Sequence, residues 1–214
     1  MFTLARSNAN ANEPKARHRR ARLEPLFHVD RELFVVTRAH ETYYREELRD
    51  VDDSRIILQL LNRGTGVAVA LALLHILQRD ADAVVVFVPY DHYYSDAEAC
   101  SRVIRLAISG AEQYSDSIVL VGAKACYPEV EYGWIELGST ISHAPIPLLR
   151  VNRFWEKPSL SQAQELLPGG CLWNTFVTVG HAKTFLDWSV HRFRTWFCPS
   201  ARLWQKMNWT LRTG

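Results

Sequence analysis

An acidic residue directly after a buried strand is the clearest candidate for chemistry in this sequence. The run A-V-V-V-F-V at residues 83–88 is short, apolar and rich in β-branched residues, which predicts a strand buried on both faces. It leads into P-Y-D-H at residues 89–92, so Asp91 follows the end of this strand. Mg²⁺ takes few oxygen ligands from protein and the rest from phosphate and water, which makes Asp91 a candidate magnesium ligand. An ordinary turn is the alternative, because Pro and Asp are common turn residues.

A second candidate segment joins the strand that precedes this one to a helix. A glutamine amide offers one acceptor and two donors, which suits the edge of a nucleotide base. A glycine lets the backbone approach a ligand closely, and the free N–H groups at a helix start favour an anion. The nucleotide-binding candidates are therefore Gln59, Asn62, Arg63, Gly64 and Thr65. The alternative is an ordinary strand–helix turn with Thr65 as the helix cap.

A third group of polar residues lies in the second half of the chain. Glu156 and Lys157 are adjacent in W-E-K-P, and on a regular strand they would face opposite ways. Pro158 indicates that the strand ends there, which would let both side chains reach one ligand. Asn174 in L-W-N-T adds a compact donor and acceptor for hydroxyl groups. A surface ion pair followed by a turn is the alternative.

The elements that position these residues alternate in the first half. Strands are predicted at residues 33–37, 56–58, 83–88 and 118–121, and helices at residues 40–48, 67–78 and 96–109. This alternation predicts an α/β layer fold with a mainly parallel sheet. Ligands of such sheets sit beyond the carboxyl ends of the strands, where Gln59 and Asp91 both lie.

The second half of the chain is richer in strands. They are predicted at residues 132–137, 148–155 and 172–179, as an addition to the first half and not an independent domain. Ser161 and Gln164 form a capping-box pattern that starts a short helix, and Gly169-Gly170 ends it.

The two ends of the chain differ from the middle. Residues 1–29 are predicted to be a disordered basic tail, residues 30–188 a partial domain, and residues 189–214 an unassigned tail rich in Trp and basic residues. The formal net charge of +2 gives no bulk argument for nucleic acid or membrane. No apolar stretch reaches the ~20 residues of a transmembrane helix, no secretory signal is evident, and a cytoplasmic location with reduced cysteines is expected.

Taken in order, six motifs resemble the sugar-1-phosphate nucleotidyltransferases, most closely bacterial mannose-1-phosphate guanylyltransferase-like proteins. The resemblance covers roughly residues 31–188. It implies a Rossmann-like mixed, mainly parallel sheet with helices on both faces, the nucleotide-diphospho-sugar transferase fold. The motifs are V-V-T-R-A-H (35–40), Q-L-L-N-R-G-T-G (59–66), V-F-V-P-Y-D-H-Y-Y-S-D (86–96), E-Y-G-W-I-E (131–136), F-W-E-K-P (154–158) and L-W-N-T-F-V-T-V-G (172–180).

The resemblance also implies a reaction and roles for residues. A sugar-1-phosphate, here mannose-1-phosphate, would attack the α-phosphorus of a nucleoside triphosphate, here GTP, to form a nucleotide sugar and pyrophosphate. Asp91 and Lys157 would be the catalytic residues, with Asp91 on Mg²⁺ and Lys157 on the sugar phosphate. Gln59 and Gly64 would lie at the base. Gly133 would pass close to the sugar, and Glu156 and Asn174 would bind its hydroxyls.

The sequence departs from this family at both ends. The family opens with a strand and a Gly-rich loop that holds the triphosphate, and R-A-R-L-E-P-L at residues 20–26 echoes it without a glycine. The family's second metal-binding Asp is also missing, because Asp187 follows the L-W-N-T strand too soon. An incomplete sheet without its first strand is therefore expected, with reduced stability, association into homo-oligomers and little transferase activity.

Three functional hypotheses remain. The chain is a family enzyme that binds a nucleoside triphosphate and a sugar-1-phosphate, or a catalytically inactive fragment or sugar-nucleotide-binding module of that family. The third, a nucleic-acid-binding protein that uses the basic ends, is disfavoured by the motifs and by the lack of aromatic residues in the first tail. No membrane partner is expected.

Overall fold

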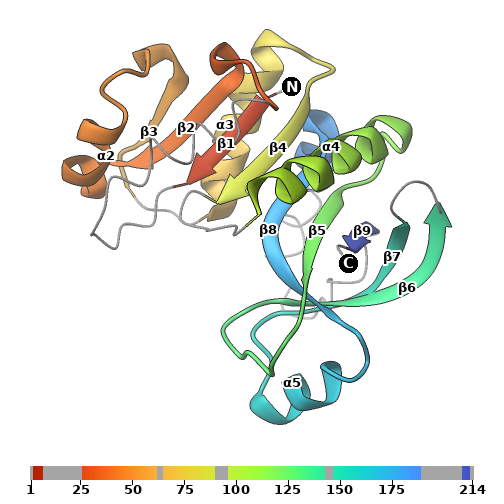
Figure 1. The fold of residues 1–214 in the computed structure, drawn as a ribbon. Helices are drawn as coiled ribbons and strands as arrows, with labels where there is room; N and C mark the ends of the chain where they lie inside the picture. The colour runs from red at the N-terminus through yellow and green to blue at the C-terminus, as the bar shows by residue number, and fades with distance from the viewer. Residues whose placement is uncertain are drawn as a thin grey trace.

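The computed structural model describes residues 2–6, 26–61, 65–89, 96–142, 147–188 and 209–212. These residues form a single mixed sheet with the strand order β3-β2-β1-β4-β8-β5-β9-β7-β6, flanked by helices (Figure 1). The strands are β1 (Phe2–Arg6), β2 (Glu32–Thr37), β3 (Ile56–Gln59), β4 (Val84–Pro89), β5 (Val119–Lys124), β6 (Trp134–Ser142), β7 (Leu148–Trp155), β8 (Leu172–His181) and β9 (Trp209–Arg212). The longer helices are α2 (Glu41–Glu47), α3 (Thr65–Arg79), α4 (Ala97–Gln113) and α5 (Leu160–Leu166), and the 3-10 turns are Val29–Arg31, Arg38–His40 and Asp53–Arg55.

Strand β1 occupies the centre of the parallel part of the sheet. Leu4 is in register with Leu33 of β2 and with Phe87 of β4, and both pairings are parallel. The prediction that residues 1–29 form a disordered tail is therefore wrong for residues 2–6, and the expected gap at the first strand is filled. The physical reason is that β2 and β4 each carry backbone N–H and C=O groups that need a partner on this side.

The sheet is mixed, and the expected mainly parallel pairing is not confirmed. Strands β3, β2, β1 and β4 pair in parallel, as do β5 and β9. Strand β8 is antiparallel to β4, β5 and β6, and β7 is antiparallel to β6 and β9. The pairing of β8 with β4 confirms that the strands of the second half extend the first half's sheet.

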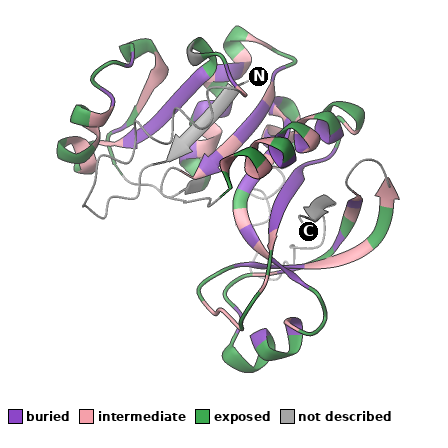
Figure 2. Ribbon diagram, viewed as in Figure 1, coloured by how far each residue is buried: buried purple, intermediate pink, exposed green. Residues whose placement is uncertain are grey.

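Helices cover both faces of the sheet, as expected. Successive strand residues point to opposite faces, so neighbouring valines of β4 enter different cores. Val85 packs with Leu73 of α3, whereas Val86 packs with Ile104 of α4 on the other face. On that second face, Phe34 of β2 packs with residues that follow α2. Figure 2 shows the buried residues running along the strands while the outer sides of the helices are exposed.

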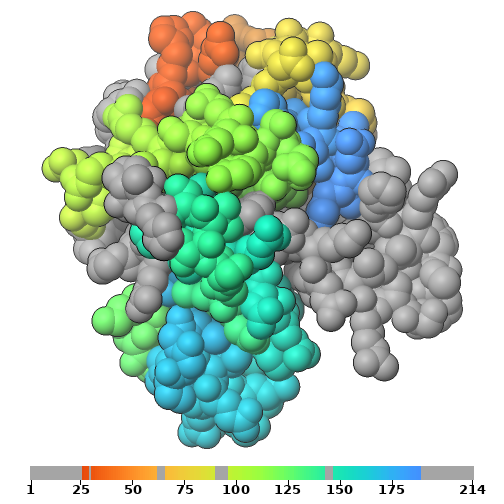
Figure 3. Space-filling view, turned by 90° about the vertical axis from the view of Figure 1, so that its right-hand side faces the viewer, coloured from red at the N-terminus to blue at the C-terminus, as the bar shows by residue number. Residues whose placement is uncertain are grey.

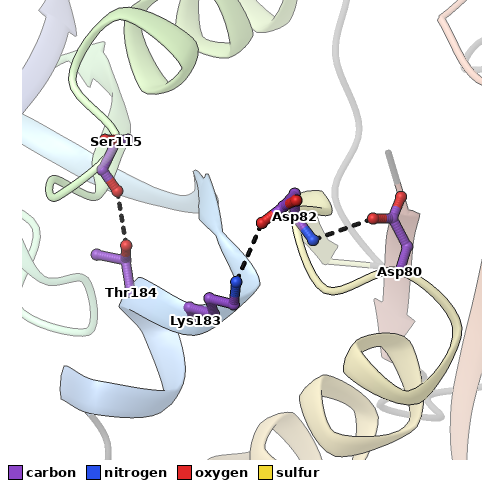
Figure 4. A network of polar contacts seen from close by, with 5 residues as sticks. All are labelled: Asp80, Asp82, Ser115, Lys183 and Thr184. Carbon is purple, nitrogen blue, oxygen red and sulfur yellow. Dashed lines mark hydrogen bonds and ion pairs between the residues drawn. The ribbon is translucent and has the colours of Figure 1, made fainter.

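The amino end of β4 is tied to the end of β8 by polar contacts (Figure 4). Residues 182–188 are helical, and the N–H of Ala182 donates to the carbonyl of Ala83 at 2.9 Å. Lys183 Nζ lies 3.0 Å from Asp82 Oδ1, and Thr184 Oγ1 donates to the carbonyl of Ser115 at 2.6 Å. This end of the sheet is thus closed by the chain itself, opposite to the edge where ligands are expected.

Helix α5 lies in the lower lobe that β6 and β7 form with it (Figures 1 and 3). Its capping box consists of Ser159 and Gln162, two residues earlier than the predicted Ser161 and Gln164. The sequence contains both patterns. Pro158 disfavours a helical conformation at the preceding Lys157, and the helix begins soon after the proline with the earlier pattern. Ala163 and Leu166 then pack against the buried Trp134.

None of the helices in the described ranges combines the length and apolar character needed to cross a membrane.

Candidate functional site

The carboxyl ends of the parallel strands meet at one edge of the sheet. Thr37 of β2 is in register with Gln59 of β3, and Arg6 of β1 with Pro89 of β4. Gln59 is 7% exposed, so its amide is held within the end of the sheet and not on the open surface. Helix α3 begins at Thr65, two residues before the predicted start at Val67, so Thr65 is the first helical residue and not the cap before it. The candidates Asn62, Arg63, Gly64 and Asp91 lie outside the described residues, so their roles stay predictions.

Gly133 and Asn174 are brought together where β6 begins and β8 runs beside it. The N–H of Asn174 donates to the carbonyl of Gly133 at 2.7 Å. A Cβ added to Gly133 would lie 2.6 Å from Cζ of Phe154, a buried ring of β7. Core packing therefore requires this glycine, in addition to the approach to a sugar that the resemblance implies.

Glu156 and Lys157 lie directly after β7, which ends at Trp155 and so confirms the predicted strand end. Lys157 Nζ is 2.9 Å from Oε2 of Glu131, and both side chains are largely exposed. The hydrogen bond to Glu131, and then its charge, raise the pKa of Lys157. Lys157 is thus a firmly protonated cation, already paired with a carboxylate that a bound phosphate would have to displace or share.

Aromatic side chains surround the Gly133 backbone. Trp134 is fully buried and its Nε1 donates to the carbonyl of Glu129 at 2.7 Å. Trp173 packs edge-on against Tyr127 and Tyr132, with ring centroids 4.7 and 5.6 Å apart. These contacts fix the turn before β6 and the start of β8 relative to each other, which gives Asn174 a defined position.

Strand β8 bulges directly after Asn174. Its register with β5 shifts between Leu120 and Gly122. Thr175 Oγ1 donates to the carbonyl of Val121 at 2.5 Å, and Asn174 Oδ1 accepts from the N–H of Phe176 at 3.1 Å. The side chains of the L-W-N-T motif thus hold an irregular backbone in place.

Two non-glycine residues of the described chain have a left-handed backbone, and both belong to this site. They are Lys157 with φ 43° and Phe176 with φ 58°. Phe176 lies within one of the sequence motifs but was predicted to have no role, and Glu131 was not predicted as the partner of Lys157. No sequence signal indicates the left-handed conformation of Phe176, because an aromatic residue is unfavourable at positive φ.

The structure separates the two predicted ligand ends. Four strand steps divide β3, which carries Gln59, from β8, which carries Asn174. At the usual strand spacing this is about 19 Å. Gly133 and Asn174 are in hydrogen-bond contact, Lys157 is paired with Glu131, two residues before Gly133, and Gln59 lies apart from them. A nucleotide sugar has its base and its sugar at opposite ends of a diphosphate, so such a separation suits it.

The described ranges contain no group of three or more His, Cys, Asp and Glu side chains that could hold a metal ion. Asp187 lies in the helical segment beyond the amino end of β4, whereas Asp91 follows the carboxyl end.

The fold of this chain is similar to that of solved structures. A mannose-1-phosphate geranyltransferase from Thermus thermophilus superposes with a TM-score of 0.78 at 23% identity, covering 99% of this chain and 73% of its own. A mannose-6-phosphate isomerase from Helicobacter pylori gives a TM-score of 0.68 at 24% identity, covering 100% of this chain and 85% of its own. A likeness at these identities shows a shared fold of mixed sheet and helices.

The family follows from sequence similarity. The profile of the nucleotidyl transferase family matches residues 22–201, and the chain belongs to this family. The alginate biosynthesis protein AlgA of Pseudomonas fluorescens is 32% identical over 162 residues, which are 74% of this chain and 33% of that protein. A mannose-1-phosphate guanylyltransferase of Escherichia coli is 29% identical over 171 residues, 78% of this chain and 35% of that protein. The chain thus spans about a third of the length of these curated relatives.

Proposed function

We propose that this chain carries the nucleotidyl-transfer domain of a mannose-1-phosphate guanylyltransferase. A phosphate oxygen of mannose-1-phosphate attacks the α-phosphorus of GTP. The bond from that phosphorus to the β-phosphate oxygen breaks, and pyrophosphate leaves as GDP-mannose forms. The observation that carries this proposal is the family match over residues 22–201, together with relatives of that name.

The chain's own residues would mainly position the two substrates. Gln59 is proposed to read the base at the carboxyl end of β3. Asn174 and Glu156 are proposed to bind sugar hydroxyls, and Lys157 the sugar phosphate. Such a transfer depends on alignment and charge neutralisation more than on proton transfer.

Asp91 is the residue proposed to hold Mg²⁺. The ion would supply charge neutralisation at the phosphates, with phosphate oxygens and water as its remaining ligands. This role rests on the position of Asp91, two residues after the carboxyl end of β4.

Steady-state turnover with GTP, mannose-1-phosphate and Mg²⁺ tests the enzyme proposal. We expect Asp91→Asn to reduce kcat by at least about a hundredfold, since it removes the metal carboxylate. Asp187→Asn is the matched control, because it removes an exposed carboxylate from the other end of β4. Equal losses in both variants, or none in either, would contradict the role of Asp91.

A sugar-nucleotide-binding module without turnover is the second candidate. The observation that favours it is the lack of glycine in residues 7–25, which follow β1 where the family's Gly-rich loop is expected. Without glycine a tight anion-binding loop is hard to form. Calorimetry separates the two candidates: binding of GDP-mannose with no pyrophosphate release in the assay supports the module, and turnover in the usual enzyme range excludes it.

A further inference from the structure

Phe176 is unusual among the described residues in its conformation and its exposure. Its φ of 58° is a left-handed conformation, which costs an aromatic residue conformational free energy. Its side chain is 48% exposed, although the flanking Val177 of the same strand is 1% exposed. The fold therefore holds Phe176 in an unfavourable backbone conformation that leaves its large apolar ring partly exposed. Such features cluster at ligand-binding sites.

The position of Phe176 in the sheet places it at the ligand edge. Strand β8 is paired antiparallel with β4 up to Phe87 and Thr178. Beyond this pair β4 continues to Pro89, and Phe176 precedes Thr178 by two residues in the antiparallel β8. Phe176 therefore lies toward the carboxyl end of β4, the end that leads to Asp91 in the sequence. Open α/β sheets bind ligands beyond the carboxyl ends of their strands.

The bulge fixes Phe176 relative to the sugar-side residues. Its N–H donates to Oδ1 of Asn174 at 3.1 Å, and the N–H of Val177 donates to Thr175 Oγ1 at 3.3 Å. Because Thr175 is itself tied to the carbonyl of Val121, the backbone on both sides of Phe176 is held. The backbone that carries the ring is thus fixed before a ligand binds, which reduces the conformational entropy lost on binding.

We infer that the Phe176 ring packs against the hexose of the bound sugar phosphate and determines affinity for that part of the ligand; this inference rests on the proposed function. The sugar is favoured over the base because Gln59 lies four strands away in the sheet. A hexose presents C–H groups on one face and hydroxyls at its rim. An apolar ring beside the amide of Asn174 matches both chemistries, as ligand pockets generally do.

Calorimetric titration of the full chain with GDP-mannose and with GDP tests this role. We expect Phe176→Gly to weaken GDP-mannose binding about five- to tenfold, the scale of one lost ring contact, and to leave GDP binding unchanged. Phe176→Tyr keeps the ring and should retain the preference. Leu160→Ala on α5 is the matched control, because it removes a similarly exposed apolar side chain.

Thermal unfolding of the same variants separates a ligand contact from a packing role. Glycine relieves the positive φ, so we expect the Tm of Phe176→Gly to stay within a few degrees of wild type. A large fall in Tm, or unchanged affinity for GDP-mannose, would overturn the role of Phe176 alone. A wild-type chain that binds neither GDP-mannose nor GDP would overturn the proposed function and this role together.

Discussion

Gly133 occupies a position where any side chain would meet a buried aromatic ring. Because Cζ of Phe154 lies 2.6 Å from the place of a Cβ, Gly133→Ala must displace that ring from the core. We expect a loss of about 1–3 kcal/mol in the free energy of unfolding, the usual scale of overpacking. Denaturant unfolding followed by fluorescence measures it.

Gly66→Ala is the control for this substitution. Gly66 is exposed in the first turn of α3, and a Cβ there would have no neighbour within 4 Å. Alanine should be neutral or slightly stabilising at that position. If Gly133→Ala is equally neutral, the packing of Phe154 does not require a glycine at this position.

The Cys100 thiol on α4 should react slowly at neutral pH. Burial, and next the nearby Asp96 carboxylate, raise the pKa of Cys100 to about 11. At pH 8 the thiolate is then roughly one part in a thousand. We expect its alkylation by iodoacetamide, followed by peptide mass spectrometry, to keep rising with pH beyond 10. Asp96→Asn should accelerate it, since it removes the charge and keeps a capping side chain. A plateau near pH 8 would contradict this prediction.

At the scale of single elements, the cap of α5 distinguishes two overlapping patterns. The Ser159 hydroxyl accepts from the N–H of Gln162 at 3.3 Å, and Gln162 Oε1 accepts from the N–H of Ser159 at 3.0 Å. We expect Ser159→Ala to cost about 0.5–2 kcal/mol of stability, because it leaves a helix N–H without this partner. Thermal unfolding checks it. Gln164→Ala, which alters the unused pattern, should change stability by less than about 0.5 kcal/mol.

The sequence predicted the elements better than their pairing. Periodicity alone located β7 at residues 148–155 and placed α3 and α4 to within a few residues. The antiparallel course of β8 could not be predicted, because direction within a sheet depends on contacts between distant segments. The same limit applies to the site. The residue types of Asn174 and Lys157 indicated which ligand groups they could bind. The bulge at Phe176 and the ion pair between Lys157 and Glu131, however, depend on how distant segments of the chain assemble.

At the scale of the whole molecule, the short strand β1 decides whether the sheet is one unit. Composition made residues 2–6 look like part of a polar tail, because five residues carry little periodicity. In the structure they join β2 to β4, and without them the edge pair β3 and β2 would lose its pairing with the rest of the sheet. Strand β1 thus fills the sheet centre that was expected to be open, and homo-oligomer formation stays a prediction.

Leu4→Pro tests this central role of β1. Leu4 is paired on both sides, with Leu33 and Phe87, so proline removes an N–H from a fully paired strand. We expect a loss of about 3 kcal/mol or more, which lowers Tm by about 6–12 °C and promotes association in size-exclusion chromatography. Leu4→Val is the control, because a β-branched residue keeps the strand.

In the wild type, amide hydrogen exchange at residues 3–5 should be as slow as in β2. Rapid exchange there, with an unchanged Tm for Leu4→Pro, would mean that the sheet holds together without β1.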